Sequence, residues 1–163
     1  QGARRIAQMQ ADLRAMQATV TARLTAGARR PTVFFEEWDE PHISCIRWVS
    51  ELMTIAGGDD CFPELALEPM GKQRIIADGA TIVQRAPDIV LGSWCGKKFR
   101  PEKVAVREGW AEVPAVRDGQ LFEIKSADIL QPGPAALTDG VQQMHRIFMQ
   151  WMDKPLPLRG ASQ

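Results

Sequence analysis

Residues 31–41 have the sequence Pro-Thr-Val-Phe-Phe-Glu-Glu-Trp-Asp-Glu-Pro, and this stretch decides the fold. Its first part, residues 32–36, is short, β-branched and aromatic, which is typical of a buried strand. A second run of this kind, Asp-Ile-Val-Leu, occupies residues 88–91. Between them, residues 43–56 have helical apolar spacing and end at a Gly-Gly pair. Strands that alternate with helices predict an α/β fold, here a single three-layer αβα lobe with a mostly parallel sheet.

Further elements follow from capping residues and turn signals. Three more helices are predicted: a short one capped by Asp78 that ends before Pro87, one over residues 101–107 and one over about 135–152. Residues 113–116 and 121–124 flank a turn with Asp-Gly at its centre. This pattern predicts a β-hairpin.

The first segment reads as one long helix from about residue 3 to residue 26, which would be roughly 36 Å long. Apolar residues recur along it at steps of three and four: Ile6, Met9, Leu13, Met16, Val20 and Leu24. Gly27 is a suitable stop. A coiled-coil arm, a core helix and a strut between two lobes are all compatible with this pattern.

Composition excludes some classes of protein. The 163 residues include 20 Lys and Arg and 20 Asp and Glu, so the chain lacks the basic excess typical of nucleic-acid binders. No apolar stretch is long enough to cross a bilayer. The chain opens directly in helical sequence, without a signal peptide, as an excised fragment would. Cys45, Cys61 and Cys95 are an odd set, and all three are expected to be free thiols.

Two loops follow the two predicted strands, over residues 36–42 and 92–99. In a parallel sheet such loops meet at the carboxyl edge, where ligands bind. The second loop combines Trp94 and Phe99 with Lys97 and Lys98, which suits a large ligand that is partly anionic and partly aromatic. The alternative, that Trp94 covers the core edge and the lysines are solvated, stays open. The loop is no phosphate-binding P-loop, because its glycines enclose three residues and no Ser or Thr follows the first lysine.

No motif indicates an enzyme. The acidic run contains Glu36, Glu37, Asp39 and Glu40. It offers carboxylates for acid–base catalysis or for coordination of a hard cation, but a solvated loop is the favoured interpretation. The two histidines have no zinc-site spacing, and His145, next to the apolar stripe of the last helix, is expected to be structural. We therefore expect neither catalytic residues nor a metal site nor a cofactor.

Several stretches resemble one family of proteins. They are Pro-Thr-Val-Phe-Phe-Glu-Glu-Trp-Asp-Glu-Pro at 31–41, Ile-Arg-Trp-Val-Ser-Glu-Leu at 46–52, Ile-Ala-Gly-Gly at 55–58, Ala-Pro-Asp-Ile-Val-Leu-Gly-Ser-Trp-Cys-Gly-Lys-Lys-Phe at 86–99 and Ile-Leu-Gln-Pro-Gly-Pro at 129–134. In this order they are similar to the periplasmic substrate-binding proteins of cobalamin and iron-siderophore ABC importers, the helical-backbone metal receptors. The pieces at 36–41 and 92–99 resemble a branch usually labelled cobalamin-binding.

The resemblance implies two α/β lobes joined by one long helix, with the ligand clamped between them. Residues 1–27 would then be the linking helix and residues 28–163 the C-terminal lobe, with the N-terminal lobe absent. The ligand would be a metal chelate, a corrinoid such as cobalamin first and a ferric siderophore or haem next, delivered to an ABC permease. The expected ligand-binding residues are Trp38, Glu37, Ser93, Trp94, Lys97 and Lys98. The expected location is the periplasm, or the outer face of the cytoplasmic membrane for a lipoprotein.

Two further expectations concern partners. Members of this family dock on the permease through an acidic residue on each lobe, and alignment on Pro87 puts Ala80 at that position. Asp78 is the nearest carboxylate and is the expected docking residue. Apolar surface at Met9 and Leu13, left exposed without the other lobe, would favour a homodimer. The rival hypothesis is a nucleotide- or cofactor-dependent α/β enzyme domain.

Overall fold

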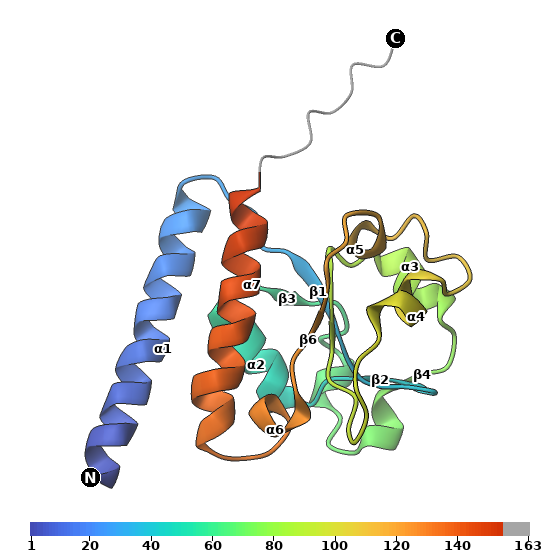
Figure 1. Ribbon diagram of the computed structural model, residues 1–163. Coiled ribbons are helices and arrows are strands. Elements are labelled where there is room, and N and C mark those ends of the chain that lie inside the picture. Colours follow the sequence, from blue (N-terminus) through green and yellow to red (C-terminus); the bar gives the residue numbers. More distant parts are fainter. Residues whose placement is uncertain (155–163) are drawn as a thin grey trace.

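The computed structural model describes residues 1–154 and has three layers, with an open sheet between two sets of helices (Figure 1). One layer contains α1 (Gly2–Thr25), α2 (Arg47–Ala56), α6 (Ser126–Ile129) and α7 (Val141–Asp153), which continues the π-helical turn Ala136–Gly140. The other contains α3 (Ala80–Arg85), α4 (Pro101–Ala105) and α5 (Pro114–Arg117). The predicted α/β fold with helices on both faces is confirmed. Residues 155–163 of the expected lobe lie outside the described part.

The sheet has the strand order β4-β2-β1-β5-β6, and β3 also pairs with β1. Its strands are β1 (Thr32–Asp39), β2 (His42–Ser44), β3 (Asp59–Asp60), β4 (Ile75–Ile76), β5 (Ile89–Gly92) and β6 (Leu121–Glu123). The pairs β1–β3, β1–β5 and β5–β6 are parallel, whereas β1–β2 and β2–β4 are antiparallel. The 3-10 turns Leu65–Leu67 and Gly71–Arg74 lead into β4.

Alternating side chains of β1 fill two separate cores. Val33 and Phe35 belong to the cluster that includes residues of α1, α2 and α7. Phe34 points to the other face, where its ring lies 5.7 Å from that of Phe62 and 6.4 Å from that of Trp110. All three β1 side chains are fully buried. A strand buried on both faces is what its unbroken apolar run predicts.

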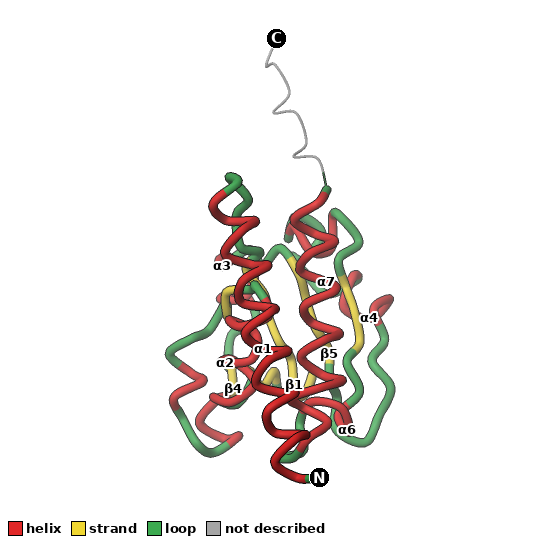
Figure 2. Tube along the Cα trace, turned by 90° about the vertical axis from the view of Figure 1, so that its left-hand side faces the viewer, coloured by secondary structure: helices red, strands yellow, loops and turns green. Residues whose placement is uncertain are grey.

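Helix α1 lies beside α7, and Figures 1 and 2 show the two helices next to each other from perpendicular directions. Its C-terminal half is packed, with Met16 and Val20 buried, and Gly27 follows its end in the left-handed region at φ 101°. Its N-terminal half is less covered, because Ile6 is 54% exposed and Met9 is half-buried. The association expected through this half stays a prediction.

The prediction of a β-hairpin around Asp118-Gly119 is wrong. Residues 114–117 form the short helix α5, and β6 pairs in parallel with β5 instead of turning back on the preceding segment. Pro114 stands in the first turn of α5, where its fixed φ and missing N–H are tolerated. The amide of Gln120 then donates to the Ala115 carbonyl, which closes the helix. The Asp-Gly pair therefore belongs to a helix end.

The helix predicted over residues 43–56 begins later, at Arg47. Residues 42–44 are strand β2, which pairs with β1 on one side and β4 on the other. The Glu37 carboxylate accepts a hydrogen bond of 2.8 Å from the Ile46 amide, next to the helix start. Tertiary pairing with β1 thus overrides the helical spacing of the first residues.

The three cysteines are free thiols, as predicted; Cys45 and Cys61 are buried and Cys95 is exposed. Among residues 1–154, no helix combines the length and the apolar character that a membrane crossing requires.

Candidate functional site

The carboxyl ends of three neighbouring strands lie at one edge of the sheet. Strands β1, β5 and β6 are in register there, with Glu36 opposite Gly92 and Gly92 opposite Glu123. The segments that follow these residues are therefore neighbours, as predicted for the loops after the first two strands. The N-terminal end of α1 lies at the same end of the molecule (Figures 1 and 2).

Lys97 connects the two predicted loops. Its Nζ lies 2.7 Å from Asp39 Oδ1. The same atom lies 4.5 Å from the ring centroid of Trp38 and 5.1 Å from that of Trp94. Burial is the largest influence and favours a higher pKa for Asp39, but the hydrogen bond and charge of Lys97, a backbone hydrogen bond and the charge of Arg107 together outweigh it and lower the pKa of that carboxyl. Asp39 is therefore held as a carboxylate beside the ammonium group.

A cavity of about 550 Å³ opens beside this loop, where β5 and β6 end. We call it the lysine cavity; its lining residues are Trp94, Gly96, Lys97, Lys98, Glu123, Ile124, Lys125 and Ser126. Three of the predicted ligand-binding residues are among them. Ser93 is buried behind this wall, with its hydroxyl 3.5 Å from that of Ser126.

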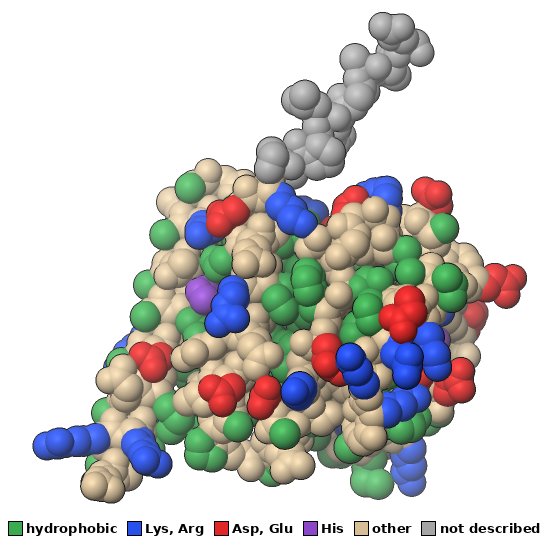
Figure 3. All heavy atoms as spheres, viewed as in Figure 1, with side chains coloured by type: hydrophobic (Ala, Val, Ile, Leu, Met, Phe, Trp, Pro, Cys, Tyr) green, Lys and Arg blue, Asp and Glu red, His purple; other side chains and the backbone are tan. Residues whose placement is uncertain are grey.

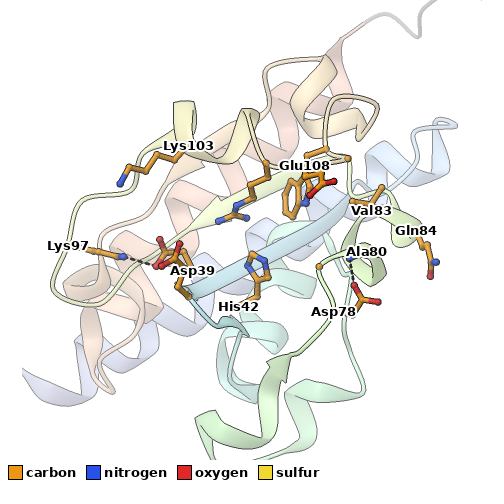
Figure 4. Close-up of a pocket in the computed structure, with 14 residues that line it drawn as sticks. Asp39, His42, Asp78, Ala80, Val83, Gln84, Lys97, Lys103 and Glu108 are labelled. Carbon is orange, nitrogen blue, oxygen red and sulfur yellow. Dashed lines mark hydrogen bonds and ion pairs between the residues drawn. The ribbon is translucent and has the colours of Figure 1, made fainter.

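A second cavity, of about 880 Å³, lies on the other side of Lys97 (Figure 4). Its walls are the β1–β2 turn with Asp39 and His42, the start of α3, and the segment after α4 with Arg107 and Glu108. Asp78 lies in this wall, and its Oδ1 accepts a hydrogen bond of 2.9 Å from the Ala80 amide. The carboxylate thus accepts the first amide of α3, although the N-cap residue is Gly79 and not Asp78 as predicted, and it remains exposed to solvent.

Between the two cavities lies a buried cluster that the sequence did not reveal, formed by Glu36, His42, Trp94 and Arg107. Glu36 is fully buried. Arg107 donates to both of its oxygens, at 2.9 and 2.7 Å. His42 Nδ1 lies 3.0 Å from one oxygen, and Trp94 Nε1 donates to the other at 3.0 Å. We call this group the Glu36 cluster.

The pKa of Glu36 is lowered in this setting. Burial alone would raise it, but the hydrogen bonds from His42 and Arg107 and the charge of Arg107 more than offset the burial. The favoured interpretation of the acidic run as a solvated loop is therefore wrong for Glu36. A signal was present, because Glu36 is two residues beyond Phe34 and so shares its buried face of the strand.

Glu37 lies away from both cavities. Its side chain accepts the Ile46 amide and pairs with the buried Arg74 at 3.1 Å. Burial raises the pKa of Glu37, although the Ile46 amide and Arg74 act in the opposite direction. Its contacts tie β1 to α2 and to the turn before β4, so the structure gives it a structural environment and not the ligand-facing one that was expected.

Trp38 and Trp94, both expected to bind the ligand, differ in their surroundings. Trp94 is only 3% exposed, and its ring packs edge to face on Phe99, with centroids 5.0 Å apart. Trp38 is half-buried, lines neither of the two cavities and donates through Nε1 to the Glu40 carbonyl at 3.0 Å. Trp94 therefore belongs to the core, which is the alternative that the sequence had left open for this ring.

Other candidates have ordinary explanations. His145 Nδ1 lies 2.9 Å from the Ala56 carbonyl oxygen, which fits the predicted structural role. Within the described residues, no three His, Cys, Asp or Glu side chains are grouped as ligands for a metal ion. This edge of the sheet therefore has a cavity lined by basic residues, next to the buried Glu36 cluster.

Comparisons with known proteins extend these observations. A family model described as periplasmic binding protein matches residues 2–127. No curated protein matches the chain.

Similar solved structures include the periplasmic vitamin B12 binding protein BtuF of Vibrio cholerae, with a TM-score of 0.63, 20% identity and coverage of 90% of this chain and 52% of that one. The periplasmic heme-binding protein BhuT in complex with two hemes has a TM-score of 0.70, 20% identity and coverage of 93% and 56%. Helicobacter pylori CeuE with Ni(II) bound has a TM-score of 0.70, 14% identity and coverage of 96% and 48%. The chain thus spans about half the length of these proteins, and at such identities the likeness shows the fold.

Proposed function

Because the chain belongs to the periplasmic binding protein family, we propose that it is part of the substrate-binding component of an ABC importer. In this proposal the substrate is a metal chelate that the protein binds and delivers to the permease. Similar proteins are described as binding vitamin B12, hemes or Ni(II), all of which contain a metal. The proposed location is the periplasm or the outer face of the cytoplasmic membrane.

The observation that carries this proposal is the lysine cavity at the carboxyl ends of β5 and β6. Cavities at this edge are the usual binding places of open α/β sheets. Its volume of about 550 Å³ lies in the range of small-molecule sites. Trp94, Lys97 and Lys98 line it, and Ser93 is buried behind them. These residues are the proposed ligand-binding group, to which Trp38 contributes by supporting Lys97.

The position of α1 is an argument for a second lobe. Its N-terminal half leaves Ile6 exposed and Met9 half-buried, at the end of the molecule where β1, β5 and β6 end. In the proposal, residues 1–27 link a preceding lobe to the lobe that starts at residue 28. A lobe attached there would face the lysine cavity and close the site, and it would cover the apolar residues of α1. In its absence, a homodimer through this surface is the expected substitute.

Titration of the protein expressed from its complete reading frame tests the function. We expect its tryptophan fluorescence to respond to cyanocobalamin, to hemin or to a ferric siderophore, because Trp38 and Trp94 both lie within contact range of Lys97. ATP and nicotinamide nucleotides should cause no change. A response to nucleotides without a response to any chelate would favour the rival enzyme hypothesis.

Docking on the permease is proposed to involve Asp78. Its carboxylate is exposed at the start of α3, free to meet a basic group on a partner. Because the same carboxylate accepts the Ala80 amide, Asp78→Ser is the informative variant: a serine hydroxyl can accept the same hydrogen bond, and the charge is removed. We expect weaker capture of the permease by this variant, with an unchanged melting temperature.

A further inference from the structure

The lysine cavity contains more positive charge than the neighbouring acids neutralise. Lys97 is paired with Asp39 at 2.7 Å. Lys98 and Lys125 line the same cavity, and among the described residues neither lies within 4.0 Å of a carboxylate oxygen of Asp or Glu. They follow two different strands, β5 and β6, whose parallel pairing brings both loops to one edge. Two lysines therefore line the cavity without a counterion from the described part of the chain.

The acid in the cavity wall is already engaged. Glu123 Oε2 accepts a hydrogen bond of 2.8 Å from the Phe99 amide. This bond fixes the end of the loop that carries Lys97 and Lys98 to the end of β6. The carboxylate thus holds the loop in place, and its other oxygen is the remaining acidic group at the cavity. On balance the cavity offers positive charge to a ligand.

The surrounding surface does not share this bias. Figure 3 shows Lys and Arg side chains mixed with Asp and Glu over the part of the face that contains α4. The larger cavity on the other side of Lys97 is likewise mixed, with Asp39, Asp78 and Glu108 opposite Lys103 and Arg107. The excess of unpaired basic groups is thus a property of the lysine cavity.

We propose that the lysine cavity is a subsite for negatively charged oxygen groups at the rim of the chelate, and that Lys98 and Lys125 contact those groups. This inference rests on the proposed function and names its substrate class: a chelate with net negative charge. The carboxylates of haem and the oxygens of a catecholate siderophore share this chemistry. A corrinoid or a hydroxamate siderophore without net charge lacks it, so the subsite selects against the corrinoid that the sequence resemblance favours.

Binding measurements on the protein from its complete reading frame test the subsite. The probes are hemin, a ferric tris-catecholate, a ferric trihydroxamate without net charge and cyanocobalamin. We expect hemin and the tris-catecholate to bind more tightly than the two uncharged probes. Their affinity should fall as salt is added, because salt screens exposed charges. Which of the two binds identifies the source of the anionic groups.

The variant Lys98→Gln/Lys125→Gln completes the test. We expect it to lose about tenfold or more in affinity for the anionic probe and to bind the uncharged probes as before, because about 1.4 kcal/mol corresponds to tenfold. Lys103→Gln, in the other cavity, is the matched control and should bind normally. Since all three lysines are exposed, circular dichroism should show unchanged folds.

Equal or tighter binding of the uncharged probes, or an unaltered affinity of the double variant, would overturn the subsite and leave the proposed function standing. If none of the four chelates bound, both would fall.

Discussion

The Glu36 cluster and the lysine cavity share Trp94, and they use charge in opposite ways. In the cluster, the fully buried Glu36 receives hydrogen bonds from three side chains. In the cavity, Lys98 and Lys125 are exposed and have no ion pair within the described residues. Buried charge is tolerated only when it is matched, whereas a charge at the surface is stable without a partner. The Glu36 cluster therefore holds the loop after β5 in place through Trp94, and the lysine cavity is available to bind a ligand.

The largest expected effect comes from breaking the matched charges. Glu36→Ala leaves Arg107 without its carboxylate in a mostly buried position, so we expect the free energy of unfolding to fall by about 3–5 kcal/mol. Chemical denaturation measures this. Glu102→Ala is the control, because Glu102 pairs with Arg100 at 3.7 Å on the surface and should change stability by less than about 1 kcal/mol. Similar losses for both variants would show that the cluster does not carry the stability inferred for it.

The second effect separates the two tryptophans. Trp94→Phe preserves most of the packing but removes the hydrogen bond to buried Glu36, which we expect to cost about 1.5–3 kcal/mol. Trp38→Phe removes a hydrogen bond to the exposed Glu40 carbonyl and should cost about 1 kcal/mol or less. Thermal melts of both variants give the comparison. An equally small loss for Trp94→Phe would show that its hydrogen bond to Glu36 contributes no more to stability than a bond at the surface.

Acid should distinguish the neighbouring carboxylates Glu36 and Glu37. The pKa of Glu36 is lowered in the fold, so its stabilisation is present above the ordinary pKa of glutamate and is lost as pH falls through the lower folded value. The pKa of Glu37 is raised, so its contribution to the pH dependence has the opposite sign. We expect the free energy of unfolding to fall less steeply with decreasing pH in Glu36→Gln and more steeply in Glu37→Gln. The slopes should change by up to about 1.4 kcal/mol per pH unit.

Unfolding curves at a series of pH values between about 6 and 3 measure these slopes. Slopes that change in the same direction for both variants would contradict the opposite pKa shifts of Glu36 and Glu37.

The fold was predictable from sequence because its decisive signals are local. The apolar run at residues 32–36 and its partner at 88–91 indicate strands buried on both faces, and they became β1 and β5. The hairpin failed because an Asp-Gly pair fits both a β-turn and a helix end. Only Pro114 at a helix start and the register of β6 with β5 decide between these. Register between distant strands is not encoded within a short window.

The site was less predictable than the fold. The two loops meet at the carboxyl edge of the sheet, and Lys97 and Lys98 line a cavity there, which agrees with the pattern of loop residues. Which way each ring faces depends on tertiary partners, since Trp94 turns inward to Glu36 across 58 positions in the sequence. Glu123 and Lys125 escaped notice because the strand that ends at Glu123 was assigned to a hairpin. Once β6 is parallel to β5, the same edge rule would have found them.

The smallest expected effect concerns Trp38, which touches the site only through Lys97. Because its ring lies 4.5 Å from Lys97 Nζ and lines neither cavity, Trp38→Ala removes a support for the lysine and not a ligand contact. A cation–π contact at an exposed position is worth about 0.5–1 kcal/mol, so we expect hemin to bind about two- to fivefold more weakly. Trp38→Phe keeps an aromatic face for the ammonium group and should lose less. A loss well beyond tenfold would mean that the ring itself contacts the chelate, which would move the centre of the site from the lysine cavity towards β1.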